Sequence, residues 1–195
     1  MKDIRLLSRD FYSRDTVRVA KNLLGKRLVR VRGRTRMAGR IVEAEAYRGS
    51  DDPASHAYRG KTPRNTPMFG EPGHAYIYFT YGNHYCLNIT TQRSGIAGAV
   101  LIRALQPLEG IRTMKRLRSL VPESELTNGP GKLTKALGID KSLNEVDMTK
   151  WGPLFVEDTE YDGFEIARSS RIGIKEGLDR KWRFYVVGSK CVSRR

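Results

Sequence analysis

The spacing of apolar residues predicts a chain built mostly of strands, with a few short helices beside them. Apolar residues recur with helical spacing over residues 10–24, with Ser13 as the candidate N-cap and Gly25 where the helix would stop. Segments with the alternation or the short apolar runs of strands are residues 27–31, 37–47, 75–80, 85–91, 97–105 and 183–187. Residues 139–181 show no clear period, and we predict short strands or loops there.

The predicted strand over residues 37–47 separates small apolar side chains from two acids and an aromatic ring. Its apolar face carries Val42, Ala44 and Ala46, and its other face carries Glu43, Glu45 and Tyr47. Successive side chains of a strand point to opposite faces. We therefore expect the apolar group to pack inward and the two carboxylates to share one side with the tyrosine.

A hairpin is predicted where residues 75–80 and 85–91 are joined by the sequence Y-G-N-H. Glycine and asparagine tolerate the backbone of tight hairpin turns, which places Tyr81 at the tip. Upstream, residues 49–73 contain several prolines and glycines and no period, and they include His56. An irregular loop of this length in a compact domain is commonly functional.

Basic and glycine-rich segments follow the predicted strand at residues 97–105. The run P-L-E-G-I-R-T-M-K-R-L predicts a basic helix with Pro107 near its first turn, and residues 122–127 resemble a linker. The run N-G-P-G-K-L predicts a short helix whose first N–H groups could meet a phosphate.

The charge of the chain points to a polyanionic partner. The 195 residues are long enough for a single domain, 1–195, and carry 36 Lys and Arg against 21 Asp and Glu, a net charge of +15 spread over the whole length. Basic residues that merely solvate the protein are the simpler alternative, but an excess of this size favours nucleic acid, and no basic amphipathic helix suggests a membrane. The N-terminal residues lack the apolar run of a signal peptide, so we expect a cytoplasmic protein, with a monomer as the default.

Glu45 is the candidate catalytic group, because it shares a strand face with Tyr47 and precedes the loop that holds His56. A carboxylate can activate water for attack on the anomeric carbon of a sugar. Two alternatives stay open: an exposed surface acid, or a glycosidase pair with Glu43, whose distance from Glu45 on a strand approaches that in retaining glycosidases. Arg103 follows an apolar run, and a buried arginine needs an acid such as Glu45 beside it.

Aromatic residues interleaved with basic ones fit nucleic acid, because every base offers a face for stacking. Tyr76 and Tyr78 share one face of their strand, where core packing is the common fate of a tyrosine. Tyr81 is harder to bury at a hairpin tip and could enter a groove as a wedge that fills the gap left by an extruded nucleotide. Asn88 could read a base edge or merely satisfy backbone groups.

A metal site is disfavoured. His56, His74, His84 and Cys86 are conceivable ligands, but H-x-C lacks the spacing of zinc ligands and no second pair completes it. The two cysteines, Cys86 and Cys191, make no disulfide framework, and we expect free thiols with Cys86 as a small core residue.

Six ordered motifs resemble those of the alkyladenine (3-methyladenine) DNA glycosylase family. They are I-V-E-A-E-A-Y, T-P-R-N-x-x-M-F, Y-x-Y-x-x-Y-G, C-L-N-I, L-I-R-A-L-x-P-L-E-G and N-G-P-G-K-L, and the resemblance runs from about Arg18 to the terminal R-F-Y-V-V-G-S. It implies monofunctional excision of damaged purines from duplex DNA in base excision repair, with no cofactor and no lyase step. Substrates of this class are 3-methyladenine, 7-methylguanine, hypoxanthine and ethenoadenine.

The resemblance also implies roles for individual residues. Glu45, the second acid of E-A-E-A-Y, would be the general base, and Arg103 would help to hold it and the water. The positions that would sandwich the flipped base are Tyr47, His56 and Tyr78, with His56 also donating a backbone hydrogen bond. Three further positions follow: Tyr81 at the intercalating tip, Met68 near the opposite strand, and Asn88 where the family excludes the amine of guanine.

The chain also departs from the family pattern. Asn83 and His84 stand where the family commonly has Met and an aromatic residue, and the loop over residues 53–67 is one residue shorter after His56. We predict one α+β domain with an antiparallel, partly barrel-like sheet, peripheral helices and a projecting hairpin that inserts Tyr81 into DNA. A damaged-DNA-binding protein without catalysis and a glycoside hydrolase using Glu43 with Glu45 are the alternative functions.

Overall fold

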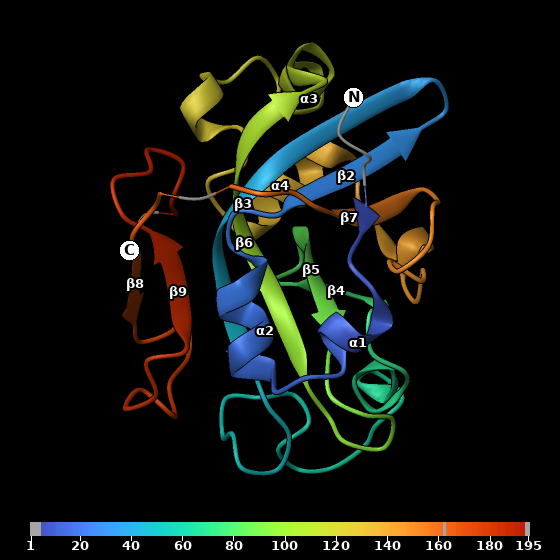
Figure 1. Cartoon of the computed structure of the whole chain (residues 1–195), viewed down its shortest axis with the longest axis vertical. Coiled ribbons are helices and arrows are strands. Elements are labelled where there is room, and N and C mark those ends of the chain that lie inside the picture. Colours follow the sequence, from blue (N-terminus) through green and yellow to red (C-terminus); the bar gives the residue numbers. More distant parts are fainter. Residues whose placement is uncertain (1–4, 162, 194–195) are drawn as a thin grey trace.

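An antiparallel sheet of nine strands organises residues 5–161 and 163–193, the part of the chain that the computed structural model describes (Figure 1). The order is β1-β7-β2-β3-β6-β5-β4, with β9 paired to β3 and β8 paired to β9. The strands are β1 Arg5–Leu6, β2 Arg27–Arg32, β3 Thr35–Tyr47, β4 Ala75–Thr80, β5 His84–Thr90, β6 Ala99–Glu109, β7 Leu154–Asp158, β8 Ile166–Ser169 and β9 Arg183–Val186. The sheet curls into a half-barrel, which confirms the predicted α+β class.

Short helices surround the sheet. They are α1 Arg9–Tyr12, α2 Thr16–Leu23, α3 Ile111–Leu117 and α4 Pro130–Leu137, with 3₁₀ turns at Thr66–Phe69, Glu123–Glu125 and Lys141–Leu143. None of the helices in the described residues is long and apolar enough to cross a membrane.

The single helix predicted over residues 10–24 is wrong, because the chain breaks into α1 and α2 there. Asp15, rather than Ser13, caps α2: its Oδ1 accepts the N–H groups of Val17 and Arg18, each at 3.0 Å. A carboxylate satisfies two of the free N–H groups at a helix N-terminus and suits its partial positive charge. Ser13 instead follows the last residue of α1.

Strand β3 has neighbours along both edges, and this determines where its acids lie. Residues 38–47 run beside β6, while the other edge of β3 pairs first with β2 and then, at Glu43–Glu45, with β9. Register shifts between Ile41 and Ala44 mark the change of partner. Glu43 and Glu45 are consequently fully buried in the interior of the sheet, so the reading of Glu45 as an exposed surface acid is wrong.

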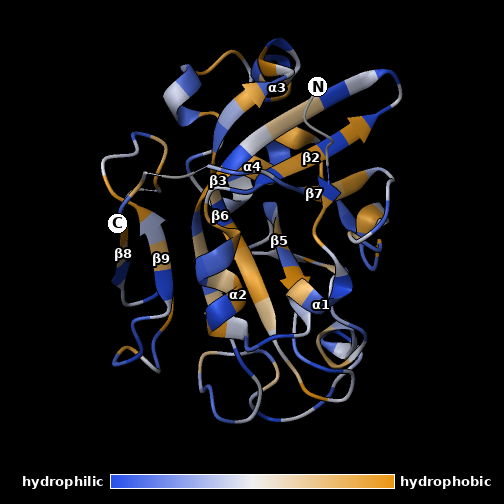
Figure 2. Ribbon diagram, viewed as in Figure 1, coloured by the Kyte–Doolittle hydropathy of each residue, from blue (hydrophilic) through white to orange (hydrophobic). Residues whose placement is uncertain are grey.

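The main core lies on the face of β3 opposite the acids. Val42, Ala44 and Ala46 all belong to it, as predicted, and α2 adds its own apolar side to the same cluster. Hydrophobic residues concentrate along β6 and on the central strands in Figure 2. Burying each Leu or Val side chain here contributes about 1.5–3 kcal/mol, so the core anchors the strand that carries the acids.

Two predicted assignments need correction, and the short strands expected in residues 139–181 are found. Pro107 lies inside β6 and not in a helix. It pairs with Gly39 of β3 beside a register shift, and a proline is tolerated there because the regular hydrogen-bond ladder is already interrupted. Residues 122–127 are not a linker, because Thr127 is buried and its Oγ1 donates to the Leu105 carbonyl at 2.6 Å. The unassigned stretch 139–181 supplies β7 and β8.

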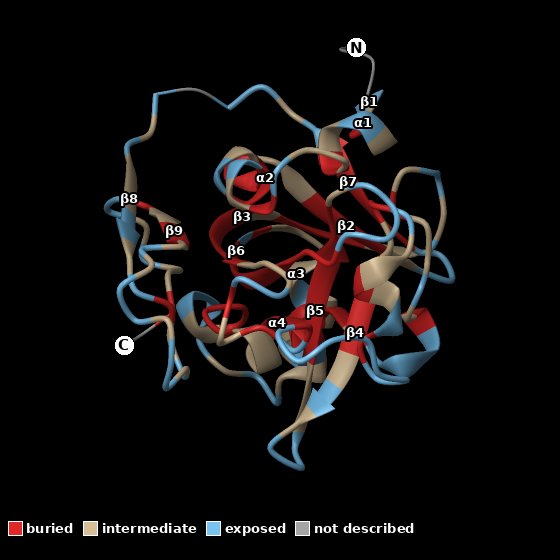
Figure 3. Ribbon diagram, turned by 90° about the horizontal axis from the view of Figure 1, so that it is seen from below, coloured by how far each residue is buried: buried red, intermediate tan, exposed pale blue. Residues whose placement is uncertain are grey.

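Strands β4 and β5 form the predicted hairpin, which projects from the body of the molecule (Figure 3). Its turn has positive φ at Tyr81 (49°) and Gly82 (68°), and the Asn83 N–H bonds the Thr80 carbonyl. Positive φ at both central residues matches the twist of the flanking strands. Tyr81 is 79% exposed at the tip, while its insertion into DNA stays a prediction.

Candidate active site

Pairing across four strands brings the predicted site residues together. Tyr76 of β4 lies opposite Asn88 of β5, Asn88 opposite Leu101 of β6, and Leu101 opposite Glu45 of β3. Because side chains in register share a face, residues up to 56 positions apart form one row. The next position along the hairpin pairs Tyr78 with Cys86.

A cavity of about 190 Å³ opens over this row. Its size lies below the roughly 300–1,000 Å³ typical of sites for drug-sized ligands, so it suits a small ring system better than an oligosaccharide. The residues that contribute to its wall include Tyr47, Ala54, His56, Met68, Tyr76, Tyr78, Tyr81, His84, Cys86, Asn88, Arg103 and Ile172.

Glu45 lies directly behind the wall of this cavity, held by three residues that line it. Its Oε2 accepts the Tyr47 hydroxyl at 2.8 Å and Arg103 Nη1 at 3.3 Å, and its Oε1 accepts the Ile172 N–H at 2.8 Å. A carboxylate offers about four acceptor positions, so these contacts leave one on Oε1 for a further donor such as water.

The surroundings of Glu45 work on its pKa in opposite directions. Burial raises the pKa above its ordinary value, while Arg103, the Ile172 N–H and the Tyr47 hydroxyl oppose that rise. Burial and the neighbouring carboxylate also raise the pKa of Tyr47, so its hydroxyl stays protonated and donates. The carboxylate is therefore a stronger base than an exposed glutamate and still has cationic and neutral donors to stabilise its ionised form.

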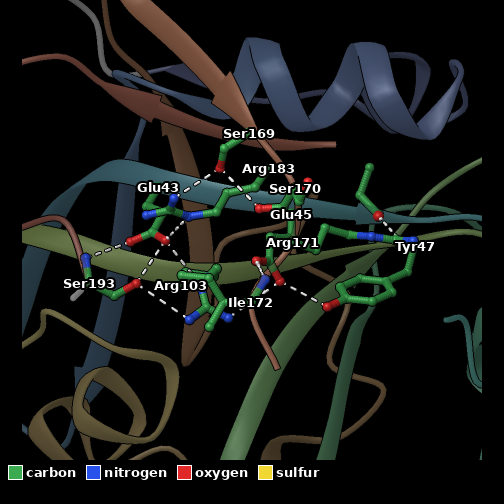
Figure 4. A network of polar contacts seen from close by, with 11 residues as sticks. Glu43, Glu45, Tyr47, Arg103, Ser169, Ser170, Arg171, Ile172, Arg183 and Ser193 are labelled. Carbon is green, nitrogen blue, oxygen red and sulfur yellow. Dashed lines mark hydrogen bonds and ion pairs between the residues drawn. The ribbon is translucent and has the colours of Figure 1, made fainter. Parts of the chain in front are cut away.

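Arg103 joins the two acids of β3 (Figure 4). Its Nε donates to Glu43 Oε1 at 3.0 Å, its Nη1 to Glu45, and its Nη2 to Ser193 Oγ at 3.4 Å. The fork of the guanidinium thus fixes three side chains at once, which a lysine could not do. The predicted pairing of Arg103 with Glu45 is confirmed.

Glu43 has a structural environment rather than a catalytic one. Besides Arg103, its carboxylate accepts Arg183 Nε at 2.7 Å, and both the N–H and the hydroxyl of Ser193, at 2.6 and 2.8 Å. Three of these four donors reach Oε1 and one reaches Oε2, so the carboxylate is held by three separate segments of the chain. Arg103 bonds both Glu43 and Glu45, so Glu43 serves as an anchor for the arginine, an arrangement unlike that of a glycosidase pair.

The opposite wall of the cavity is aromatic. His56 Nδ1 and the Tyr76 hydroxyl are hydrogen-bonded at 3.0 Å, and the His56 and Tyr78 rings meet edge to face with centres 4.7 Å apart. Burial, and then the charge of Arg64, lower the pKa of His56, so its ring is neutral at pH 7. Tyr47 is a further aromatic residue of the cavity lining.

Four other predicted residues have mixed outcomes. Asn88 lines the cavity and also donates to the Tyr76 carbonyl at 3.1 Å, so both of its suggested roles are compatible with the structure. Cys86 and Cys191 are free thiols, but Cys86 lies in the cavity wall as well as in the sheet. Met68 is 2% exposed and packs in that wall, and its position near the opposite DNA strand stays a prediction.

Comparison with known proteins decides the family. The family model for methylpurine-DNA glycosylase (MPG) matches residues 10–190. The chain belongs to this family. It is 51% identical to a protein of Carboxydothermus hydrogenoformans over 97% of this chain and 100% of that one, and 48% identical to a protein of Methanocella arvoryzae over 97% and 96%. A protein of Clostridium acetobutylicum is 46% identical over 96% and 97%. All three are provisionally named 3-methyladenine DNA glycosylases.

Membership of the methylpurine-DNA glycosylase family confirms the resemblance seen in the motifs. It also confirms the predicted class of enzyme, a glycosylase that hydrolyses N-glycosyl bonds in DNA. Within the described residues, no cluster of three or more His, Cys, Asp or Glu is arranged to hold a metal ion.

Several residues of this methylpurine-DNA glycosylase site have no signal in the sequence. Ile172 contacts Glu45 through its backbone N–H, which any residue could supply. Arg183 and Ser193 reach Glu43 from segments 140 and 150 positions away. Asp52 and Arg171 form a buried ion pair across 119 positions. Such pairings depend on the path of the chain between the partners, so a local sequence pattern cannot predict them.

Proposed function

We propose that this protein is a monofunctional glycosylase that flips alkylated or deaminated purines out of duplex DNA and hydrolyses their N-glycosidic bond, as part of base excision repair. The observation that carries the proposal is the buried Glu45 behind a small aromatic cavity, with one acceptor position left on its carboxylate. The net charge of +15 supplies the attraction to DNA that such an enzyme needs.

In the proposed reaction, Glu45 accepts a proton from a water molecule as the oxygen of that water bonds to C1′ of the flipped nucleotide. The bond between C1′ and the purine nitrogen breaks, and its electron pair leaves with the base. Arg103 keeps the Glu45 carboxylate ionised before the transfer and aligned during it. No covalent bond to the enzyme forms, so the product is an abasic site.

The aromatic cavity holds the base in this scheme. Tyr47 stacks on one side and His56 with Tyr78 on the other, and His56 also donates its backbone N–H. A purine alkylated at N3 or N7 is cationic, is attracted to aromatic faces and leaves as a neutral molecule. A neutral purine such as hypoxanthine needs a proton on N7, and the backbone near Ala54 is placed in the cavity wall to accept the hydrogen bond of that proton.

Two further residues set access and selectivity. Tyr81, exposed at the tip of the projecting hairpin, fills the gap in the duplex that the flipped nucleotide leaves. Asn88 disfavours the exocyclic amine of undamaged guanine, because its Nδ2 is held by the Tyr76 carbonyl and the side chain cannot turn away. 7-Methylguanine carries the same amine, but its cationic base leaves readily enough to be excised. We expect the enzyme to act as a monomer.

The test is single-turnover incubation with duplexes that carry one hypoxanthine or one 1,N6-ethenoadenine, followed by alkali to break abasic sites. Wild-type protein should yield breaks, Glu45→Gln should bind the duplex without breaking it, and Glu123→Gln, an exposed acid, should behave as wild type. If wild type breaks neither duplex nor a methylated one while still binding, the alternative of a catalytically silent binder is correct. Breakage by Glu45→Gln at the wild-type rate would remove Glu45 from the mechanism.

A further inference from the structure

A buried ion pair that the proposed reaction does not use lies behind the cavity. Arg171 and Asp52 are both buried, and the guanidinium grips the carboxylate at two points, Nη1 to Oδ2 at 2.6 Å and Nη2 to Oδ1 at 2.7 Å. Nη1 also donates to the Ala46 carbonyl at 2.9 Å. Two parallel charge-assisted bonds of this kind fix the orientation of both side chains.

The same guanidinium covers one ring of the cavity. Arg171 Cζ lies 4.7 Å from the centre of the Tyr47 ring and 5.3 Å from the centre of the Trp182 ring. Tyr47 lines the cavity and Arg171 does not. Arg171 is therefore behind the ring, on the far side from a base that stacks on Tyr47 in the cavity.

A charge behind Tyr47 would act on a base stacked in front of the ring, because one ring separates the two and little water is present to screen the charge. A lone guanidinium in this position would repel a cationic purine on the other side of the ring and would compete with it for the electrons of the ring. Asp52 cancels that charge at contact distance. The backbone N–H groups of Arg48 and Ala54 also donate to the Asp52 carboxylate, at 3.0 and 3.3 Å, and fix its position.

We propose that the Arg171–Asp52 pair determines the charge preference of the base cavity. The pair orients Tyr47 rigidly and leaves almost no net charge behind it, so that cationic alkylated purines and neutral deaminated ones are both accepted. The inference rests on the proposed function, because it requires a damaged purine stacked on Tyr47.

The size of the effect follows from the geometry. A base stacked about 3.5 Å in front of the ring lies roughly 8 Å from the guanidinium. An uncompensated charge at that distance, with an effective dielectric constant of about 20, corresponds to a change of about 30-fold in affinity for a cation, and solvent at the mouth of the cavity lowers this to on the order of tenfold. A neutral base feels little of it.

The experiment compares single-turnover excision of 7-methylguanine, a cationic lesion, with that of hypoxanthine, a neutral one, from matched duplexes. Asp52→Asn leaves the cation uncompensated and should lower the 7-methylguanine to hypoxanthine rate ratio by about tenfold. Arg171→Gln leaves the anion and should raise the ratio. The neutral double variant Asp52→Asn/Arg171→Gln should return the ratio to within about threefold of wild type, even if both rates fall.

Opposite shifts from the two single variants cannot arise from loss of packing alone. If both single variants lower the two rates equally, the pair is a structural anchor and the proposal is wrong. If a single variant fails to fold, as judged by circular dichroism, the double variant still tests the inference. The double variant has no charge behind Tyr47, so a 7-methylguanine to hypoxanthine rate ratio that differs about tenfold from wild type would refute the inference. A wild-type protein that excises neither lesion would refute the proposed function instead.

Discussion

Replacing Arg103 with Met is the sharpest test of how the two acids of β3 are kept in the interior. Arg103 is 6% exposed and its partners are fully buried, with Nε 3.0 Å from Glu43 and Nη1 3.3 Å from Glu45. Met fills a similar volume without a charge. Glu43 keeps its bonds from Arg183 and Ser193, whereas Glu45 is left with the Tyr47 hydroxyl and the Ile172 N–H.

The expected loss of stability can be bounded from these distances. Each ion pair is worth about 5 kcal/mol of Coulomb attraction at an effective dielectric constant of about 20, before the cost of removing the charges from water. Breaking a buried pair by removing one partner costs about 3–5 kcal/mol in practice. Against a total of about 5–15 kcal/mol for a folded domain, Arg103→Met should stay folded with a markedly lower free energy of unfolding.

The assay is urea unfolding at pH 7.5 of the wild type, Arg103→Met, Glu45→Gln and the double variant. In Arg103→Met, Glu45 is the acid left with an uncompensated charge. Adding Glu45→Gln should therefore raise the free energy of unfolding of that variant by about 1–2 kcal/mol instead of lowering it further. Additive losses within about 0.5 kcal/mol would show that the ion pair is not what the mutation breaks.

The same variant has a defined pH dependence. Burial already raises the pKa of Glu45, and loss of Arg103 removes an influence that lowers it. A carboxyl group with a raised pKa in the folded state stabilises the fold at low pH and loses that contribution as pH rises through the raised pKa. The destabilisation of Arg103→Met should therefore shrink as pH falls towards 5, and a constant difference would contradict the reasoning.

Two other changes test the site through different properties. Tyr47→Phe removes a hydrogen bond to a charged group, worth about 1.5–3 kcal/mol. Because that bond lowers the pKa of Glu45, the acid limb of the single-turnover pH–rate profile should move to higher pH. An unmoved midpoint would show that the Tyr47 hydroxyl does not affect the pKa of the catalytic group. Tyr81→Ala should leave the free energy of unfolding within about 0.5 kcal/mol, since the side chain is 79% exposed, yet slow excision by about 5- to 150-fold if it stacks in the duplex. Equal excision rates would remove it as a wedge.

Local periodicity was enough to predict much of the strand that carries the acids. The alternation in residues 37–47 correctly separated Val42, Ala44 and Ala46 from Glu43 and Glu45. The Y-G-N-H turn was predictable from Gly82, but its positive φ angles fall on Tyr81 and Gly82 rather than on Gly82 and Asn83. The need of a buried arginine for an acid likewise predicted the contact of Arg103 with Glu45.

Features set by distant partners could not be predicted in this way. The alternation in β3 shows which residues share a face. The acids are buried because β9 pairs with β3, and β9 follows residues 139–181, a stretch without a clear period in the sequence. Asp52 and Arg171 each look like ordinary surface charges in the sequence, and only the folded chain brings them together. The misplaced cap at Ser13 has another cause, since Ser and Asp are both good caps and the pattern of apolar residues does not separate them.

The hydrogen bonds of Glu43 can be completed only after the C-terminal residues of the chain have been synthesised. Three of its four bonds come from Arg183 and Ser193, which are synthesised 140 and 150 residues after it. A chain emerging from the ribosome can form the β2–β3 hairpin early, yet it holds Glu43 without most of its donors until the last strand is made. A nascent or proteolytically shortened chain that ends before Arg183 therefore lacks three of the four donors to Glu43, and Arg103 is the one that remains.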